Sequence, residues 1–309
     1  HISFANHQLQ QQLQGWLTQL RNRVRVGAEC PTAVMDLDAM LGETRLFKSE
    51  TEIQQMQAAA DLSIRAHKRA MQVCKPGLME YQLAADITHE FAMGGSARAA
   101  YSSIIGGGAN GCILHYTANQ CALSDGDLVL IDAGCELDYY AADITRTFPV
   151  NGRFSAPQRA IYQLVLDAHQ ASLAQAVAGV SVRHLQDTAV RVITAGLIQL
   201  GLLQGRIDQL IGDQSYRRFY MHNIGHWLGM DVHDVGRYKL DGDWRLLQAG
   251  MAMTIEPGIY IQPDDDSVAP QWRGIAVRIE DDIVITVDGH HNLTAELPVT
   301  IAAIEALMA

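Results

Sequence analysis

Four acidic residues occupy matching positions in an internal repeat of the sequence, a pattern that can bind metal ions. The string Leu123–Gly134 aligns without a gap on Leu247–Gly258, and each contains a Gly-containing turn, a short apolar strand candidate, and an acid followed two residues later by Gly. Each half then offers a second strand candidate that carries another acid. The four acids are Asp132, Asp143, Glu256 and Glu280.

A buried acid needs a partner, because an unpaired carboxylate in the protein interior is costly. A single acid of this kind is more often a salt-bridge partner or a turn cap than a metal ligand. Four acids at matching positions of a repeat favour the metal-ligand role instead, since carboxylates that are brought together raise each other's proton affinity unless cations neutralise them. Two divalent ions would balance the charge of the four acids, so the charge count favours a dinuclear metal site.

The segment around His222, His226 and His233 supplies imidazoles. His222 and His226 have the spacing of a zinc-peptidase helix, but Asn223 stands where the H-E-x-x-H motif needs its Glu. We expect only one of the three histidines to bind metal directly. Mostly oxygen ligands with one imidazole favour Mn²⁺ or a similar ion over a thiolate zinc site, and a dinuclear hydrolase is the chemistry that this set permits.

Helix pairs precede both repeat units and must position them. A capping box at Ser49–Glu52 predicts a helix to about Val73, and a second helix is expected from about Glu80 to Met93. A second capping box begins at Ser155, and the helices expected in this half are 155–177 and 182–200. Two helix-pair-plus-hairpin units predict a pseudo-twofold α+β domain, with helices on one face of a curved antiparallel sheet.

The residues before Phe47 differ from this pattern. We expect a helix around Leu9–Leu20, a short strand at Arg23–Val26 and an irregular segment up to Phe47. The chain opens on His1 rather than Met, as expected for a cut or processed end. Residues 1–46 are therefore interpreted as the end of a preceding domain plus a linker, and residues 47–309 as the catalytic domain.

Composition excludes several classes of protein. The chain has 309 residues and a net charge of −11, which argues against a nucleic-acid partner. No apolar run approaches the roughly 18 residues of a membrane span, so no membrane partner is expected. The 5 cysteines form no C-x-x-C pair, which favours a reducing, cytoplasmic location.

Five short strings of the sequence resemble the ligand motifs of the pita-bread metallopeptidases. They are Leu130-Ile-Asp-Ala-Gly134, Ala142-Asp-Ile-Thr-Arg146, His222-Asn-Ile-Gly-His226-Trp-Leu-Gly229, Thr254-Ile-Glu-Pro-Gly258 and Arg278-Ile-Glu-Asp-Asp282. The longer strings Asn110–Tyr116 and Gly225–Gly236 are similar to the bacterial aminopeptidase P group, the Xaa-Pro aminopeptidases. The resemblance covers about residues 47–309 and implies the pita-bread fold. It also implies five metal ligands, namely Asp132, Asp143, His226, Glu256 and Glu280.

The resemblance assigns roles to these ligands. Asp132 would hold one of two divalent ions, Asp143 and Glu280 would bridge both, and His226 and Glu256 would complete separate coordination spheres. The implied ions are Mn²⁺, and the implied nucleophile is a hydroxide between them. Glu256 is the expected acceptor of its proton during attack on the peptide carbonyl.

Further side chains would act on the substrate. By the same resemblance, His115 and His233 polarise the carbonyl or stabilise the oxyanion, and His222 lines a proline pocket. Arg278 and Tyr260 would orient the substrate or the bridging acids. The alternative for each of these histidines, including His222, is a structural role beside the site.

The implied activity is hydrolysis of the N-terminal peptide bond of substrates with proline at the second position. Two alternatives stay open: a prolidase restricted to Xaa-Pro dipeptides, or an inactive fragment that acts only as a peptide-binding module. A methionine aminopeptidase is disfavoured by the preceding domain remnant and the string His226-Trp-Leu-Gly229. We expect the full-length protein to be a homo-oligomer.

Strand alternation distinguishes Glu280 from the two acids that follow it, Asp281 and Asp282. Arg278 and Glu280 should face the same side of a strand, whereas Asp281 should face away. Asp281 and Asp282 are therefore predicted to be surface or hairpin acids. Trp227 is predicted to be a core residue rather than a substrate contact.

Overall fold

The computed structural model describes residues 1–309, and its central part is built from two similar halves. Each half places a pair of helices before a three-stranded antiparallel sheet. The first half contains α3 (Glu50–Val73), α4 (Glu80–Met93), β2 (Ile104–Gly107), β3 (Leu128–Asp132) and β6 (Thr145–Pro149). The second contains α5 (Ala156–Gln175), α6 (Val182–Gln199), β9 (Ala252–Ile255), β12 (Asp281–Ile285) and β13 (His290–Asn292). The predicted α+β architecture with a pseudo-twofold repeat is confirmed.

The two sheets meet where the repeated acids lie. In the first sheet the strand order is β2-β3-β6, and in the second it is β13-β12-β9. A further antiparallel pair, β10 (Gly258–Tyr260) and β11 (Ala276–Arg278), stands beside them. An isolated β-bridge between Thr145 and Glu280 connects the two sheets, with the amide of Glu280 donating to the carbonyl of Thr145. The register therefore brings the end of β11 against the start of β6.

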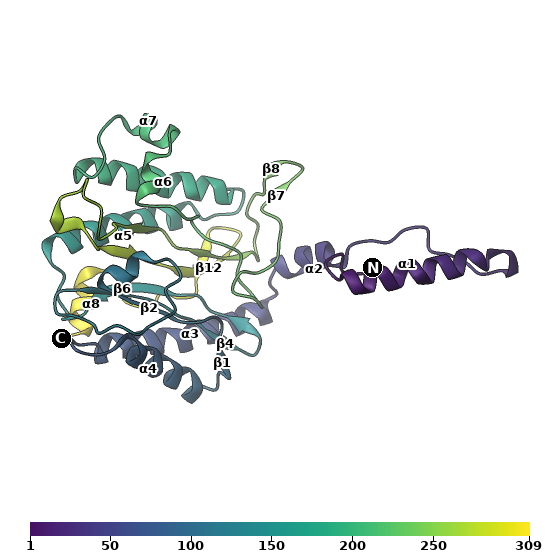
Figure 1. Cartoon of the computed structure of the whole chain (residues 1–309), viewed down its shortest axis with the longest axis horizontal. Helices are drawn as coiled ribbons and strands as arrows, with labels where there is room; N and C mark the ends of the chain where they lie inside the picture. Colours follow the sequence, from purple (N-terminus) through teal and green to yellow (C-terminus); the bar gives the residue numbers. More distant parts are fainter.

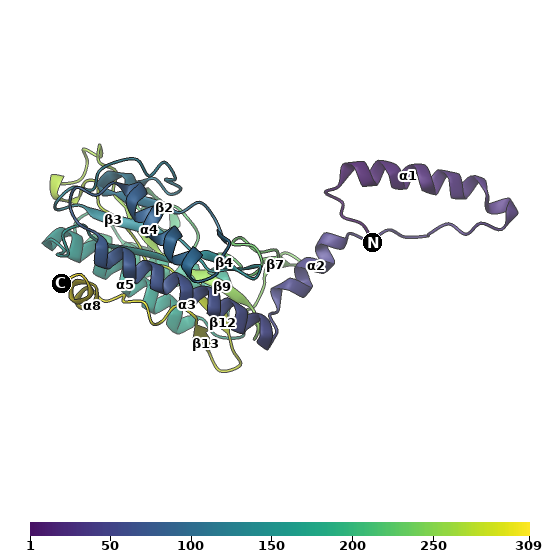
Figure 2. The ribbon, with the colours of Figure 1, turned by 90° about the horizontal axis from the view of Figure 1, so that it is seen from below.

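Helices cover one face of the strands. In Figure 2, α3 and α5 run along the same side of the sheets with α8 (Ile301–Leu307) beside them, and all three contact one another or the strands. The main hydrophobic cluster contains 56 buried residues and extends from these helices into the sheets. The fully buried Trp227 belongs to it, as predicted. The opposite face of the strands is left to the polar residues of the repeat.

The predicted helix starts match the structure closely. The hydroxyl of Ser49 accepts from the amide of Glu52, and the Glu52 carboxylate accepts from the amide of Ser49 at 2.7 Å. Ser155 and Gln158 form the equivalent capping box at α5. Capping satisfies amide donors that the first turn of a helix leaves free, and this explains why both starts were visible in the sequence.

The N-terminal segment extends away from the body, as Figures 1 and 2 show. It contains α1 (His7–Asn22) and α2 (Leu37–Leu46), and α1 has no buried residue. The predicted strand at Arg23–Val26 is wrong, because Val24–Val26 forms a 3₁₀ turn that has no neighbouring strand to pair with. The segment before Phe47, predicted to be irregular, instead contains α2, capped by the Asp36 carboxylate.

The remaining elements are short. They are β1 (Arg98–Ala99), β4 (Cys135–Leu137), β5 (Tyr140–Ala141), β7 (Lys239–Leu240), β8 (Asp243–Trp244), α7 (Ile207–Gly212), and the 3₁₀ turns Gly108–Cys112, Ser215–Arg218 and Pro270–Trp272. None of the helices combines the length and the apolar composition that crossing a bilayer requires.

Candidate metal centre

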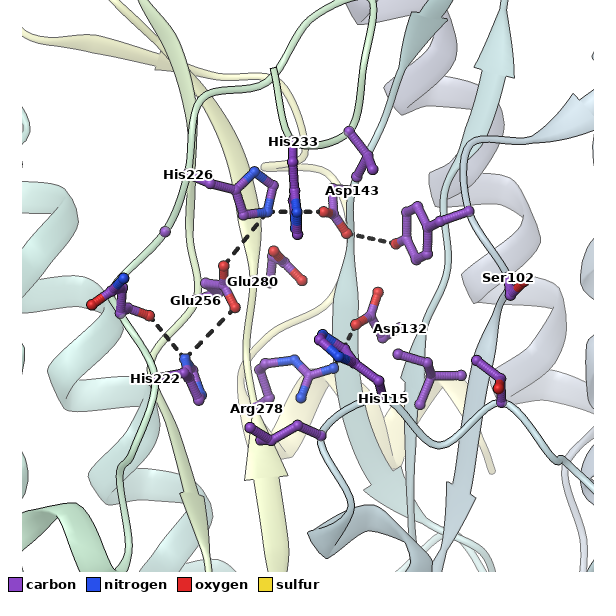
Figure 3. Close-up of a pocket in the computed structure, with 17 residues that line it drawn as sticks. Ser102, His115, Asp132, Asp143, His222, His226, His233, Glu256, Arg278 and Glu280 are labelled. Carbon is purple, nitrogen blue, oxygen red and sulfur yellow. Dashed lines mark hydrogen bonds and ion pairs between the residues drawn. The ribbon is translucent and has the colours of Figure 1, made fainter. Parts of the chain in front are cut away.

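A cavity of about 450 Å³ lies on the face of the sheets that the helices leave open, and it gathers the repeated acids from both halves (Figure 3). It is lined by Tyr101, Ser102, Ile104, Leu114, His115, Thr117, Asp132, Asp143, His222, Asn223, Gly225, His226, Val232, His233, Glu256, Arg278 and Glu280. All five predicted metal ligands are therefore brought together. The three further histidines and Arg278, also predicted from the sequence, line the same cavity.

The acids reach the cavity from strand ends. Asp132 is the last residue of β3, Glu256 follows β9, and Glu280 lies between β11 and β12. The close approach of the chain at these points requires glycine at two places. A Cβ on Gly134 would lie 1.7 Å from the carbonyl oxygen of Ala142, and one on Gly225 would lie 2.0 Å from that of Thr254. Gly134 belongs to the repeated sequence and Gly225 directly precedes His226, and a larger residue at either position would push the ligand-bearing segments apart.

His226 is oriented to offer one nitrogen to a metal ion. Its Nδ1 donates to the carbonyl oxygen of Trp227 at 3.0 Å, because a carbonyl can only accept. Its Nε2 faces the cavity, 3.3 Å from Oδ2 of Asp143 and 3.6 Å from Oε1 of Glu256. Ligand atoms of Asp143, His226 and Glu280 all lie within 4.8 Å of one another. Fixing Nδ1 by a backbone acceptor is the usual way to orient a metal-binding histidine.

Burial and crowding raise the pKa of three of the cavity acids in the metal-free chain. Burial, followed by the charges of the neighbouring acids, raises the pKa of Glu280 well above its ordinary value. Burial also raises the pKa of Glu256 to about 7 and raises that of Asp132. Although burial alone lowers the pKa of His226, hydrogen bonding to Asp143 and the negative charges raise it to about 9. Such shifts mark a site with surplus negative charge.

The residues present fit divalent metal ions. Oδ1 of Asp132 is buried without a hydrogen-bond partner, although it belongs to a carboxylate that lines the cavity. An unpaired buried oxygen is costly, and an ion within the cavity would satisfy it. Four carboxylates with one imidazole form an oxygen-rich donor set of the kind that Mn²⁺ and similar ions accept.

Arg278 is the cation that holds the acids in place. Its guanidinium donates to Oδ2 of Asp132 at 2.5 Å, to the hydroxyl of Tyr260 at 2.9 Å and to Oγ1 of Thr145 at 3.1 Å. Thr145 in turn donates to Oε2 of Glu280 at 2.6 Å. A single buried side chain therefore fixes acids from both halves, consistent with the role of orienting ligands expected for Arg278.

Tyr260 lies behind the cavity instead of in its wall. Its side chain is fully buried and does not belong to the lining set, so the structure does not place it where a substrate would touch it. Its hydroxyl donates to Nε2 of His222 at 2.9 Å, while Nδ1 of His222 donates to the carbonyl of Asn223 at 2.8 Å. Burial, followed by the charge of Arg278, lowers the pKa of His222 to about 3, so this ring is neutral.

His115 and His233 approach the cavity from loops. The ring of His233 lies edge-on to that of His226, with centroids 4.2 Å apart, and His115 stands in front of Asp132 and Arg278 in Figure 3. Both side chains are exposed, so both are accessible to a bound molecule. The site thus combines four acids, four histidines and one arginine.

The prediction that Asp281 and Asp282 are surface acids is wrong. Their exposed fractions are 3% and 1%. Asp281 pairs with the buried Arg146 at 2.6 Å and faces His169 of α5, while Asp282 accepts from the amide of Asp143 at 3.0 Å. Alternation was applied correctly to Arg278 and Glu280. However, the face of β12 to which Asp281 points is covered by α5, and Asp282, on the other face, is buried against the backbone of Asp143.

Sequence reasoning missed three hydroxyl side chains that bind the acids. Tyr101 donates to Oδ1 of Asp143 at 2.6 Å, and Thr145 donates to Glu280. Oγ1 of Thr254 donates to Oε1 of Glu256 at 3.3 Å and accepts from the amide of His226 at 3.1 Å. Thr145 follows Asp143 by two positions and Thr254 precedes Glu256 by two, so strand alternation could have found both threonines. Tyr101 carried no comparable signal.

Comparisons with known proteins agree with this geometry. The profile of metallopeptidase family M24 matches residues 54–287. The Xaa-Pro aminopeptidase of Escherichia coli K12 is 49% identical over 292 residues, covering 94% of this chain and 66% of that protein. The Xaa-Pro aminopeptidase of Haemophilus influenzae is 52% identical over 275 residues, covering 89% of this chain and 64% of that protein.

A solved structure shares the fold. The aminopeptidase PepP of Pseudomonas aeruginosa superposes with a TM-score of 0.95 at 54% identity, covering 99% of this chain and 69% of that one. The pita-bread fold expected from the sequence is confirmed by this likeness. The chain spans just under two thirds of the length of the two curated relatives, at 66% and 64%. With its family profile, its repeated acids and its fold in agreement, the chain belongs to metallopeptidase family M24.

Proposed function

We propose that this chain carries the catalytic site of a metal-dependent aminopeptidase that hydrolyses the N-terminal Xaa-Pro peptide bond. The observation that carries the proposal is the convergence of Asp132, Asp143, His226, Glu256 and Glu280 on one cavity from both halves of the fold. The names of the relatives, which are Xaa-Pro aminopeptidases at about half identity, support the substrate class.

The five residues would hold two divalent ions, for which we propose Mn²⁺. Asp143 and Glu280 come from different halves, and their ligand atoms lie within 4.8 Å of each other, which supports a bridging role for both. When bound, the ions would lower the pKa of a water molecule and polarise the substrate carbonyl. Arg278 and Thr145 would keep the acids oriented, because both are hydrogen-bonded to them.

Glu256 is the proposed acceptor of the proton released by the attacking water. Burial raises its pKa to about 7 in the metal-free chain, and a carboxylate within hydrogen-bond reach of the attacking water can act as its general base. Its Oε2 lies 3.8 Å from Nδ1 of His222, and its Oε1 faces His226. The carboxylate therefore sits between the ligand cluster and the rest of the cavity, where it can pass a proton to the leaving nitrogen.

His115 and His233 are the proposed hydrogen-bond donors to the carbonyl oxygen as negative charge develops on it. Both are exposed at the cavity and come from loops on its two sides. A donor aimed at the developing oxyanion stabilises the transition state more than the ground state. Their loss should therefore lower kcat more than it changes KM.

His222 is the proposed contact for the proline ring. Its neutral imidazole packs edge-on against Tyr220, with ring centroids 5.1 Å apart, and Tyr260 fixes its tautomer. An uncharged ring suits the apolar pyrrolidine of proline better than an imidazolium would. Leu114 and Val232 add apolar surface to the same cavity.

The test uses purified protein loaded with Mn²⁺ and an Arg-Pro-Pro tripeptide. We expect cleavage after the first residue and a loss of two or more orders of magnitude in kcat for Glu256→Gln, with Glu305→Gln as a matched control. Glu305 lies on α8 and accepts from the amide of Phe154, away from the cavity. Equal rates for the wild type and Glu256→Gln would overturn the proposal.

A dipeptide substrate distinguishes the alternatives. The aminopeptidase is expected to cleave the tripeptide at least as fast as an Arg-Pro dipeptide, whereas a prolidase would cleave only the dipeptide. A protein that binds Xaa-Pro peptides with micromolar affinity but cleaves neither would be a binding module.

The proposal extends to the organisation of the chain. Residues 1–46 would belong to a preceding domain and its linker, which the exposed α1 supports, and residues 47–309 would form the catalytic domain. We also propose a homo-oligomer for the longer protein, and a cytoplasmic location on the cysteine pattern. Size-exclusion chromatography and activity measurements of this chain beside the longer protein would test the domain organisation and the oligomeric state.

A further inference from the structure

Glu80 is a fully buried carboxylate outside the cavity, and four donors converge on it. Its Oε1 accepts from the amide of Gly107 and from Nδ2 of Asn110, both at 2.9 Å. Its Oε2 accepts from the hydroxyl of Tyr116 and from the amide of Cys121, both at 2.8 Å. Its exposed fraction is 0%, and it forms no salt bridge.

The four donors share one segment of chain. Gly107 ends β2, and the other three lie within residues 108–121, hereafter the His115 loop. Glu80 begins α4, where the free amides of the first turn favour a negative charge. The amide of Glu80 also donates to the carbonyl of Cys121 at 2.9 Å, and the amide of Leu123 donates to the carbonyl of Leu78. Glu80 therefore ties both ends of the His115 loop to the start of one helix.

His115 has no such anchor of its own. Its ring is exposed and takes part in no hydrogen bond or ion pair within the chain, yet it lines the cavity. Its direction is set by the backbone on either side. Tyr116 follows directly and is held by Glu80, while Cys112 is buried and donates to the carbonyl of Ile261 at 3.3 Å.

We propose that Glu80 is a positioning residue for His115, holding the His115 loop so that the imidazole stays over the metal-ligand cluster. The expected effect on kcat rests on the proposed function. The claim that Glu80 holds the His115 loop in place rests on the hydrogen bonds alone. It also explains the string Asn110–Tyr116, in which the two terminal side chains bind Glu80 and each other, with Nδ2 of Asn110 donating to the Tyr116 hydroxyl at 3.1 Å.

The substitution Glu80→Gln tests the proposal because an amide cannot accept from all four donors. Its nitrogen replaces one acceptor oxygen and leaves at least the amide of Gly107 or Cys121 unpaired. Glu305→Gln is the matched control, since Glu305 also accepts a backbone amide and is 7% exposed, but lies near α5 and α8. Tyr116→Phe removes one bond to Glu80 and keeps the packing, so it carries the same test should Glu80→Gln fold poorly.

The kinetic arm is a double-mutant cycle on the Mn²⁺-loaded protein with the tripeptide. We expect Glu80→Gln to lower kcat on the order of tenfold when His115 is present, since small misplacement of a catalytic group is costly. In a His115→Ala background, the same change should alter kcat by less than about twofold. Glu305→Gln should lie within about twofold of its parent in both backgrounds. An equal loss with and without His115 would overturn the proposal.

A second arm does not depend on peptidase activity. In protein labelled with ¹³C-histidine, the ring signal that disappears in His115→Ala identifies His115. We expect Glu80→Gln to shift or broaden this signal and to speed hydrogen exchange across residues 107–121, whereas Glu305→Gln leaves both unchanged. If the wild type cleaves no Xaa-Pro peptide, the proposed function fails and this arm still decides the positional claim. An unchanged His115 signal with native exchange rates would refute it.

Discussion

Arg278 and Asp132 form a buried ion pair that crosses between the two halves of the fold. The guanidinium contacts Oδ2 of Asp132, whereas Oδ1 of the same carboxylate has no partner within the chain. One oxygen is thus used to fix the acid and the other is left for a ligand. The pairing gives Asp132 a defined direction before any ion binds, which reduces the reorganisation that metal binding would otherwise require.

Removing Arg278 should destabilise the metal-free protein more than the metal-bound protein. Arg278→Met leaves the acids without their buried cation, and breaking such a pair costs about 3–5 kcal/mol. Bound divalent ions replace that positive charge, so the loss should shrink at saturating Mn²⁺. Urea unfolding with EDTA and with Mn²⁺ measures both values. Arg159→Met removes a partly exposed pair with Glu305 and should cost at most about 1 kcal/mol in either condition. A loss that is the same with and without metal would contradict this account.

Thr145→Val should weaken metal binding without unfolding the protein. The substitution keeps the shape but removes the hydroxyl that donates to Glu280 and accepts from Arg278. Loss of a partner that orients a metal ligand typically costs about 10–100-fold in affinity. Titration calorimetry with Mn²⁺ measures the change. Thr194→Val is the control, because Thr194 is equally buried but bonds only to the carbonyl of Val190 in α6. An affinity that stays at the wild-type value would show that Thr145 does not orient Glu280.

Metal binding should release protons, and its affinity should rise with pH. His226, with a pKa of about 9 in the metal-free site, carries a proton at neutral pH that a metal ion must displace. Glu256, with a pKa of about 7, is also partly protonated there. The apparent association constant is therefore expected to increase by about tenfold per pH unit for each proton displaced between pH 6 and 8. Calorimetry in buffers of different ionisation enthalpy counts the protons, and buffer-independent heats would be the contrary result.

His67 should make the protein less stable in acid. Burial lowers its pKa from 6.5 to about 4, although its ring nitrogen Nε2 donates to the carbonyl of Ala133 at 2.9 Å. Below pH 6.5 the unfolded chain takes up a proton at this residue, while the folded chain does so only near pH 4. The stabilisation is therefore complete above pH 6.5 and is lost as the pH falls toward 4, by about 3 kcal/mol in total.

The measurement for His67 compares urea midpoints at pH 7 and pH 5 in EDTA. His67→Gln should show a smaller loss between the two values than the wild type, because Gln has no proton to gain. His89→Gln, at an exposed position of α4, should keep the wild-type loss. Identical pH dependence in His67→Gln and the wild type would assign the acid sensitivity to other groups, such as the similarly buried His169.

The sequence predicted the parts of the fold that depend on local chemistry. The starts of α3 and α5 followed from capping boxes. The repeat also identified Asp132 and Glu256, and likewise Asp143 and Glu280, as equivalent positions in the two halves. Local patterns failed where the outcome depends on distant neighbours. Val24–Val26 has strand-forming residues but no strand to pair with.

The site shows the same limit. The residue types and their spacing were sufficient to name the acids and histidines that line the cavity. They could not show that Asp281 is buried, because its neutralising partner Arg146 lies 135 positions away and the covering helix contributes His169. Nor could they show that Glu80 binds the His115 loop, since that contact depends on how α4 packs beside β2.

An anomalous-scattering map at the Mn edge, from crystals grown with Mn²⁺, tests the central claim most directly. Two ions held by the repeated acids predict two peaks roughly 3.5 Å apart in the cavity. Both peaks should contact Asp143 and Glu280, with Asp132 beside one ion. A single peak that contacts only one half of the repeat, or peaks away from these carboxylates, would contradict the dinuclear site.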